Sequence, residues 1–335
     1  MTISILNRAT QPTQYTINLD QPVLIALNHL ACYLVGGEDA ASFLQGQFSN
    51  DINAVTLDQG QITSYCTPKG RMLAVFYICK NDSGYYLLTS KDIAEEVIKR
   101  LQMYVLRSKV TIKSCQNTII MGVCNDNGHT VLNTLGINPP QNPYDASSNE
   151  DAVCLNIPAP NPRYLLIGNA SLANNLQSIS NNDVYIFDES YWQWLDIMAG
   201  LPHITSNTQE EFVPQMANME LINGVNFKKG CYPGQEVVAR LHYLGNANRR
   251  MFRLDINARE AINAGDDIYN RDSDQPVGKV LSLIQESDNK YSALGVLRIE
   301  AVKTNQLVTG SSKNNSVIVM SLPYDLPIEQ KAKEN

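Results

Sequence analysis

The chain has 335 residues, a formal net charge of −7, 44% hydrophobic residues and 18% charged residues. This length predicts two or three domains, and the composition predicts large hydrophobic cores. The negative charge excludes a protein that holds nucleic acid by bulk electrostatic attraction, because that mode needs a basic surface. No apolar run reaches the roughly 18 residues that a membrane span needs. The first twenty residues also lack the pattern of a secretory or mitochondrial signal. We therefore expect a soluble, cytoplasmic protein.

The first third of the chain predicts strands and helices in alternation. Residues 23–37 indicate one or two strands that end at a Gly-Gly turn, and residues 38–52 indicate a short helix that breaks at an internal glycine. Strands are expected at 71–79 and 84–90. The clearest helix follows Ser90, an expected N-cap, because apolar residues recur at four-residue spacing from Ile93 to Val105.

The middle third continues this alternation. The expected elements are strands at 109–114, 118–124, 163–168 and 184–187, a loop at 138–149, and helices at 171–180 and 191–202, the last capped by Ser190. Alternating helices and strands of this kind predict α+β domains, in which helices cover one face of each sheet.

The pattern changes at about residue 248, where helical periodicity ends. Four apolar runs with β-forming residues follow at 250–256, 276–284, 291–299 and 316–322, with turn-forming residues between them. Several short strands at this spacing predict a small antiparallel barrel or sandwich at the C-terminus.

The seven cysteines do not form a metal-binding or disulfide pattern, because their number is odd and no two stand in a CxxC pair. Most of them lie inside apolar runs, as Cys79 and Cys124 do, and a buried cysteine behaves as a small hydrophobic residue. Cys231 is different, since its neighbours are polar, cationic or turn-forming.

The segment FKKGCYPGQEVVAR, residues 227–240, places Cys231 between cations and a tight turn. Gly230 and Gly234 allow a sharp turn and the close approach of a ligand. A helix is expected to begin at Gln235, so its positive end and the nearby lysines would favour the thiolate, the nucleophilic and metal-binding form. A loop cysteine without function is the alternative that this pattern leaves open.

Positive charge gathers in two parts of this acidic chain. Residues 228–253 carry six cations against one acid, Glu236. The six cations are Lys228, Lys229, Arg240, Arg249, Arg250 and Arg253. A second group, between Arg100 and Lys113, contains no acid. Such clusters indicate a small anionic ligand or partner, and a solvated face balanced by distant acids is the alternative.

Both tryptophans, Trp192 and Trp194, lie in one expected helix, where this spacing points them to different faces. We expect one of them in the core, while the other is free either to stack on a flat ligand or to pack.

The segment from Phe212 to Arg250, with its core KGCYPGQE, resembles the signature of the YgfZ family of folate-binding proteins. That family is related to the T-protein, the aminomethyltransferase of the glycine cleavage system, and to a mitochondrial iron–sulfur assembly factor. Further blocks resemble the family in the same order. These blocks are FLQGQFSNDI (43–52), CTPKGRML (66–73), YVLRSKV (104–110) and AGLPHI (199–204).

The resemblance implies an α+β fold of three domains in a ring around a central cavity. Two α+β domains, partly interleaved, are expected at 1–110 and 111–245, the second carrying the KGCYPGQE motif. A C-terminal antiparallel β-barrel is expected at 246–335.

The resemblance also implies a function. It implies a tetrahydrofolate-binding accessory protein for the assembly or repair of iron–sulfur enzymes, among them a radical enzyme that thiomethylates tRNA. Its effect on tRNA would be indirect, without stable nucleic-acid binding, and it would carry an iron–sulfur cluster only transiently, if at all. An assembly factor without turnover is favoured over an enzyme.

The family's signature cysteine corresponds to Cys231, which is expected to be a reactive thiol and a candidate iron–sulfur ligand. The two folate-contacting tryptophans correspond to Trp192 and to Leu30, where this chain departs from the family. The motif residues expected to support the thiol are Lys228, Lys229, Gly230, Tyr232, Gly234, Gln235, Glu236 and Arg240.

A second departure lies at Met198, where the T-protein and some relatives have a carboxylate that could hold the pterin ring. Its loss weighs against the alternative that the chain is a tetrahydrofolate-dependent one-carbon or aminomethyl transferase, because transfer needs a fixed and correctly protonated pterin. A third alternative is direct RNA binding, which the local cations permit and the overall charge opposes.

Overall fold

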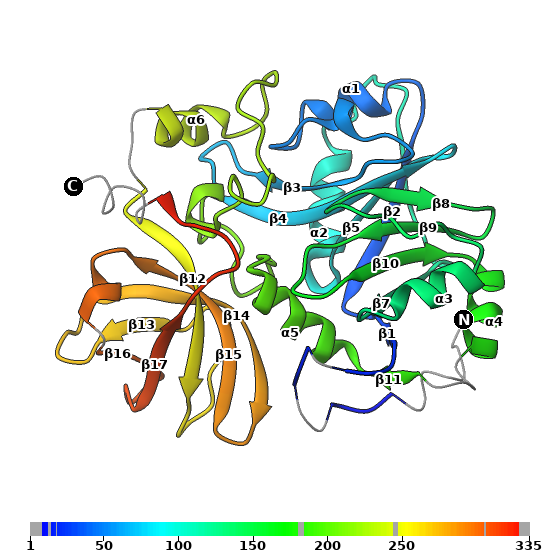
Figure 1. The fold of residues 1–335 in the computed structure, drawn as a ribbon. Coiled ribbons are helices and arrows are strands. Elements are labelled where there is room, and N and C mark those ends of the chain that lie inside the picture. Colours follow the sequence, from blue (N-terminus) through cyan, green and yellow to red (C-terminus); the bar gives the residue numbers. More distant parts are fainter. Residues whose placement is uncertain are drawn as a thin grey trace.

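The computed structural model describes residues 9–12, 15–17, 19–179, 184–243, 247–304 and 306–327. They form two mixed α/β units and a barrel (Figure 1). No helix in this part of the chain is long and apolar enough to cross a membrane.

The first unit is built on a five-stranded antiparallel sheet with the order β3-β4-β5-β2-β6. Its strands are β2 (Leu30–Gly36), β3 (Gln61–Cys66), β4 (Met72–Asn81), β5 (Gly84–Ser90) and β6 (Thr111–Ser114). Two helices belong to it, α1 (Ala40–Gln45) and α2 (Lys91–Gln102), together with a short 3-10 turn at Ile52–Ala54. The helix α2 buries Ile93, Val97 and Leu101, the apolar face that the sequence pattern predicts.

The second unit is built on a six-stranded mixed sheet with the order β11-β1-β7-β10-β9-β8. Its strands are β1 (Val23–Ala26), β7 (Ile119–Cys124), β8 (Ala146–Ser148), β9 (Ala152–Asn156), β10 (Arg163–Gly168) and β11 (Tyr185–Phe187). The helices α3 (Gly128–Thr134) and α4 (Ala170–Ile179) pack on it through a separate apolar cluster. Because β1 comes before the whole first sheet in the chain, the two units are interleaved.

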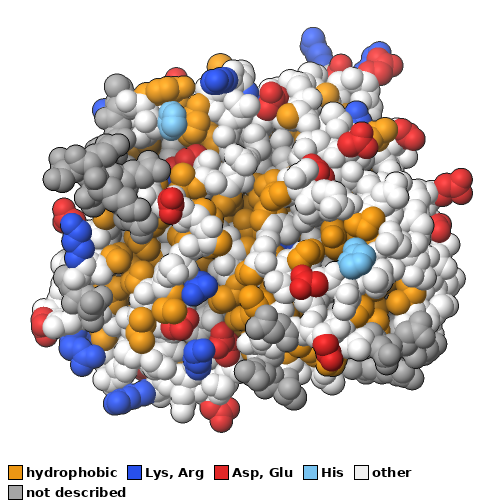
Figure 2. Space-filling view, in the orientation of Figure 1, with side chains coloured by type: hydrophobic (Ala, Val, Ile, Leu, Met, Phe, Trp, Pro, Cys, Tyr) orange, Lys and Arg blue, Asp and Glu red, His pale blue; other side chains and the backbone are white. Residues whose placement is uncertain are grey.

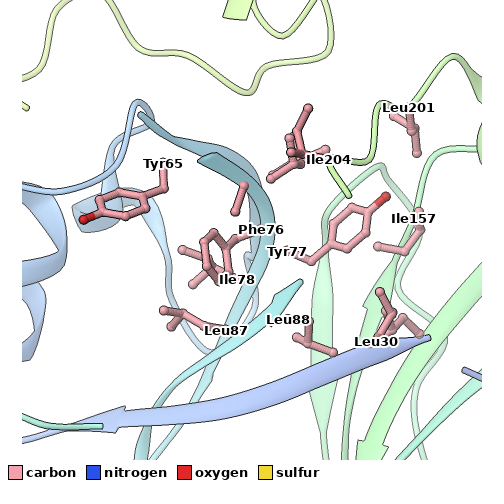
Figure 3. Close-up of a cluster of buried hydrophobic side chains, with 14 of the residues drawn as sticks. Leu30, Tyr65, Phe76, Tyr77, Ile78, Leu87, Leu88, Ile157, Leu201 and Ile204 are labelled. Carbon is pink, nitrogen blue, oxygen red and sulfur yellow. The ribbon is translucent and has the colours of Figure 1, made fainter. Parts of the chain in front are cut away.

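The principal core includes side chains of both sheets and also reaches the barrel. Strands β1, β9 and β10 are buried on both faces, which is why they read as continuous apolar runs. Figure 3 shows part of this core, with Tyr77 and Leu88 of the first sheet close to Ile157, which follows β9.

The C-terminal strands close into an antiparallel barrel with the order β12-β15-β14-β13-β16-β17, in which β17 pairs back with β12. They are β12 (Arg249–Asn257), β13 (Asp267–Asn270), β14 (Pro276–Ser287), β15 (Lys290–Arg298), β16 (Leu307–Thr309) and β17 (Asn315–Met320). A short 3-10 turn, Ala301–Thr304, precedes β16. Closure leaves the barrel with its own apolar core.

The helix α5 (Glu189–Ala199) lies between the barrel and the two sheets, at the centre of the molecule (Figure 1). A 3-10 turn at Pro214–Ala217 and the helix α6 (Gln235–Tyr243) then lead to the barrel. The predicted α+β class with a C-terminal antiparallel barrel is therefore confirmed.

Several local predictions differ from the structure. Asp188, not Ser190, is the N-cap of α5, and its carboxylate accepts a hydrogen bond from the Ser190 amide at 3.0 Å. Ser90 is at the N-cap of α2 but its side chain makes no capping hydrogen bond. The helix α2 ends at Gln102, before Val105, and the loop expected at 138–149 contains the edge strand β8.

Candidate functional site

A cavity of about 480 Å³ lies where the first unit, α5 and the barrel meet. Its walls come from these three parts and from the segment after α5, so it exists only in the assembled fold. The lining residues are His29, Ser90, Lys91, Asp92, Gln193, Asp196, Ile197, His203, Thr205, Ala264, Leu281, Ser282, Leu283 and Ile284. Hydrophobic side chains gather along the line where the barrel meets the sheets (Figure 2).

A buried carboxylate, Asp196, stands in the wall that α5 contributes. One oxygen lies 2.5 Å from the guanidinium of Arg163, and the other lies 2.9 Å from Nε2 of His203. Asp196 and Arg163 are 2% and 0% exposed. Arg163 also donates to the carbonyl oxygens of Pro158 and Trp192, at 3.0 and 3.3 Å. These contacts tie α5 to β10 and bring an imidazole to the cavity.

The charge of Asp196 is set by its partners. Burial raises the pKa of its carboxyl group, but the interactions with Arg163 and with the imidazole of His203 outweigh burial and hold this pKa below its ordinary value. The ring of His203 also meets Tyr77 edge-on, with 5.9 Å between centroids. Asp196 is therefore an ionised group that orients His203 rather than a free acid.

His29 brings a second imidazole to the cavity from the turn between β1 and β2. Its Nδ1 lies 3.3 Å from Glu189 Oε2, and this hydrogen bond lowers the pKa of Glu189. Its Nε2 is buried and has no hydrogen-bond partner among the described residues. Ser90, Lys91 and Asp92, at the N-terminal end of α2, lie on the same wall, where Lys91 supplies a cation and Asp92 a carboxylate.

Trp192 does not line this cavity. Its side chain is fully buried against β7, where a Cβ at Gly122 would lie 2.5 Å from the indole ring. The guanidinium of Arg163 stacks on the same ring, 4.5 Å from its centroid. Trp192 is thus a fully buried core residue of α5, and Gln193, the next residue, reaches the cavity.

Leu30 is also a core residue. It is 4% exposed and lies among the buried side chains near Leu88 and Ile157 (Figure 3). Its neighbour His29 faces the cavity instead. Neither of the positions expected to contact folate is therefore exposed to the cavity in this structure.

Met198 faces a different hollow, of about 470 Å³, on another side of α5. There its sulfur is 3.6 Å from a guanidinium nitrogen of Arg253 on β12. Trp194 lines the same hollow and donates a 2.9 Å hydrogen bond to Glu286 on β14. The carboxylate missing at 198 has no substitute at that position, and the buried carboxylate of α5 is Asp196.

The KGCYPGQE loop is held by Lys229. Its ammonium donates to the carbonyl oxygens of Gln45, Phe48 and Asn50, at 2.7, 2.6 and 2.9 Å. These hydrogen bonds occupy all three of its protons, at the C-terminal end of α1, where a cation is favourable. Burial lowers the pKa of Lys229 to about 8. The geometry gives Lys229 the role of a clamp on α1, not that of a donor to the Cys231 thiol.

The two glycines of the motif differ in what surrounds them. Gly234 has a φ of +83°, and a Cβ there would lie 2.6 Å from Gly70 and from the Thr67 carbonyl oxygen. At Gly230 a Cβ would meet no atom within 4 Å. The turn therefore requires a glycine at 234, where the loop packs on the β3–β4 connection, and not at 230.

Cys231 is exposed, whereas Cys66, Cys79, Cys124 and Cys154 are buried. It is not among the residues that line either of the two hollows beside α5. Of the other motif residues, Tyr232 is buried, Gln235 is half-buried, and Lys228, Glu236 and Arg240 are exposed. The described residues contain no group of three or more His, Cys, Asp or Glu side chains that could hold a metal ion.

The cationic cluster predicted at 228–253 does not form one face. Lys229 is bound to carbonyl oxygens, and Arg250 is buried in an ion pair with Glu220. Arg249 lies opposite Arg298, its register partner on the adjacent strand β15. Burial and the positive charges of Arg298 and Arg71 lower its pKa, so positive charge gathers there.

Arg163, Asp196 and His203 were not singled out by the sequence analysis. The available signal was a lone carboxylate inside the apolar helix segment WQWLDIMAG, which is unusual because a buried charge needs a partner. The partners, Arg163 and His203, lie 33 residues before and 7 residues after it, so spacing alone does not reveal them.

The chain is 29% identical over 303 residues to the tRNA-modifying protein YgfZ of Sodalis glossinidius, covering 90% of this chain and 92% of that protein. It is 28% identical over 320 residues to the YgfZ protein of Pectobacterium carotovorum, covering 95% and 96% of the two chains. No protein-family model matches.

Among solved structures, the chain resembles the glycine cleavage aminomethyltransferase T of Bartonella henselae. The TM-score is 0.72 at 15% sequence identity, and the match covers 96% of this chain and 88% of that one. At this identity the likeness shows a shared fold, and it confirms the T-protein-like architecture that the sequence predicts.

Proposed function

Because this chain is a homologue of the YgfZ proteins, we propose that it is a cytoplasmic tetrahydrofolate-binding accessory protein that helps to assemble or repair iron–sulfur enzymes. Its effect on tRNA modification is then indirect, through enzymes that carry such clusters. The observation that carries the proposal is the cavity between the three parts of the fold, with an unpaired buried imidazole nitrogen in its wall.

The residues of this cavity fit a folate. The wall from Leu281 to Ile284 supplies apolar surface for a flat ring system, and ligand pockets commonly combine such surface with a few fixed polar groups. His29 Nε2 and Gln193 offer hydrogen bonds, and Lys91 offers a cation for the carboxylates of the glutamate tail.

Asp196 differs from a free pterin-binding carboxylate, because one of its oxygens is hydrogen bonded to Arg163 and the other lies 2.9 Å from His203 Nε2. A pterin would meet His203 rather than the carboxylate. This arrangement, together with methionine at 198, supports binding without transfer, and it is the reason to place the transferase alternative second.

Folate binding is tested by anaerobic calorimetric titration with tetrahydrofolate. The decisive variant is Ala264→Trp, which puts a large ring into the cavity from a half-buried position of the barrel, and its matched control is Ala264→Ser. We expect saturable binding in the wild type and in Ala264→Ser, and at least a tenfold weaker affinity in Ala264→Trp. Equal affinity in all three proteins, or none in the wild type, would overturn folate binding in this cavity.

The accessory role is tested in cells that lack the chain, by the level of thiomethylated tRNA under oxidative stress. Wild-type protein is expected to restore the modification, and Cys231→Ser is expected not to. Restoration by the serine variant would remove Cys231 from the proposal. Turnover of methylene-tetrahydrofolate with an amine donor in the purified protein would favour the transferase instead.

A further inference from the structure

Two cysteines outside the motif face each other across paired strands. Cys32 lies in β2, and Cys115 directly follows β6, the edge strand of the first sheet. The β2–β6 register pairs Tyr33 with Ser114, so the next opposite pair is Cys32 and Cys115. The Cys115 amide donates to the Cys32 carbonyl oxygen at 3.0 Å, which continues the ladder by this pair.

Opposite residues of an antiparallel ladder have Cα atoms about 4.5–5.5 Å apart. This spacing falls within the range of about 4.4–6.8 Å that a disulfide requires. Opposite residues of a ladder project their side chains to the same face of the sheet, so the two thiols lie side by side. A covalent bond between them therefore needs no rearrangement of the sheet.

The surroundings of the two sulfur atoms are unequal. Cys115 is half-buried beside the exposed residues Ser114 and Gln116, so a small solute reaches it, whereas Cys32 is 6% exposed. Hydrogen bonds from the Cys32 thiol, the Thr118 side chain and the Leu34 backbone outweigh burial and lower the pKa of Cys115. The hydrogen bond to Cys115, together with burial, raises the pKa of Cys32.

We propose that Cys115 and Cys32 form a peroxide-sensitive thiol pair, in which Cys115 is the attacking and Cys32 the resolving cysteine. The Cys115 thiolate attacks one oxygen of hydrogen peroxide and becomes a sulfenic acid, while the other oxygen leaves as hydroxide and takes up the proton that the thiol had released. The Cys32 sulfur then attacks the sulfenic sulfur and a second water leaves. Two thiols lose two electrons to the peroxide, which is reduced to two molecules of water.

The position gives the bond a structural consequence. Residues 115–118 connect β6 of the first sheet to β7 of the second, so the disulfide fixes the start of this connection to β2. It also encloses most of the first unit in a covalent loop, which restricts the unfolded chain. This inference is independent of folate binding and of Cys231.

The test uses the full chain with Cys231→Ser, which removes the exposed thiol and keeps six of the seven cysteines. The native protein is treated with hydrogen peroxide, and its thiols are then counted after denaturation in the presence of an alkylating reagent. We expect two thiols to be lost, a peptide that links Cys32 to Cys115, a higher urea midpoint of unfolding, and reversal of all three changes by dithiothreitol.

Two further variants in the same background separate the roles. With Cys32→Ala, Cys115 is expected to stop at the sulfenic acid, which a dimedone probe captures. With Cys115→Ser, no thiol is expected to be lost. Retention of all six thiols in the parent variant, or oxidation of Cys115 without a link to Cys32, would overturn the proposal. Cys79→Ala, a buried site on β4, is the control that should leave the linkage intact.

Discussion

The Nζ atom of Lys229 lies 2.6 Å from the carbonyl oxygen of Phe48, which is 181 residues earlier in the chain. Lys229 also donates to the carbonyl oxygens of Gln45 and Asn50, so three acceptors at the end of α1 bind this lysine of the KGCYPGQE loop. The position of the exposed thiol two residues later therefore depends on α1. The tertiary fold, rather than the local sequence, therefore determines the position of Cys231.

Replacement of Lys229 by Met is expected to destabilise the protein, because three carbonyl oxygens lose a charged donor. Hydrogen bonds to charged groups contribute about 1.5–3 kcal/mol. Because water can replace part of the loss, we expect a total of about 2–4 kcal/mol, measured from urea unfolding. Lys228→Met is the matched control, since Lys228 is exposed. Equal losses in the two variants would contradict the clamp.

The two motif glycines offer a matched pair of Gly→Ala substitutions. At Gly234 the positive φ and the contact with Gly70 predict a loss of about 2 kcal/mol or more. At Gly230 the change is expected to stay within about 0.5 kcal/mol, because the added methyl group meets nothing. Thermal unfolding of the two variants checks this order, and a larger loss at Gly230 would show that the loop has another conformation.

The seven thiols are expected to react in a set order with iodoacetamide in the native state. Cys231 is exposed and should be labelled first, and the half-buried Cys115 second. Burial raises the pKa of Cys66, Cys79 and Cys124 to about 12, so they have neither access nor thiolate. Peptide mapping over time measures the order, and early labelling of Cys79 would contradict it.

The sequence correctly predicted those helices and strands whose pattern of apolar residues lies within one short stretch of the chain. The apolar stripe that starts at Ile93 identified α2, and the β-rich runs after residue 248 identified the barrel. The helix expected to begin at Gln235, after the turn-forming residues around Cys231, is α6. In each case the physical cause lies within about ten neighbouring residues.

The candidate cavity was less predictable, because its partners are distant in sequence. The burial of the Asp196 carboxylate is explained only by its contacts with Arg163 on β10 and with His203, and no sequence periodicity connects these three residues. Likewise, Trp192 was expected at a ligand, but close approach to Gly122 places it in the core. The cations beside Cys231 suggested a thiolate, whereas Lys229 binds backbone carbonyl oxygens of α1.

Replacement of Asp196 by Asn is expected to destabilise the protein by about 3–5 kcal/mol near neutral pH, because it leaves Arg163 buried without its counter-charge. The difference in stability between the wild type and Asp196→Asn should be smaller at acid pH. The folded state holds the pKa of Asp196 below its ordinary value, so the unfolded chain binds this proton at a higher pH. The wild type therefore loses this contribution as pH falls below about 4.

Urea midpoints at pH 5 and pH 3 measure this difference for the wild type and for Asp196→Asn. The gap between the two proteins should narrow at pH 3. A gap of the same size at both pH values would show that the carboxylate is not held ionised. Glu260→Gln is the control, since its carboxylate also has a lowered pKa but is only half-buried and is bonded to serines instead of a buried cation.

The close contact of Trp192 with β7 predicts the effect of Gly122→Ala. The new methyl group would lie 2.5 Å from the indole ring, which is fully buried. Overpacking of a core costs about 1–3 kcal/mol. Gly46→Ala is the matched control, because its φ is −80° and the nearest atom lies at 3.5 Å.

The same variant tests how Trp192 acts on the cavity. If the indole supports α5 from beneath, Gly122→Ala should weaken tetrahydrofolate binding together with stability, although Trp192 itself is unchanged. The titration of this variant beside Gly46→Ala measures that coupling. Full affinity in a destabilised Gly122→Ala protein would show that the cavity does not depend on the packing of Trp192.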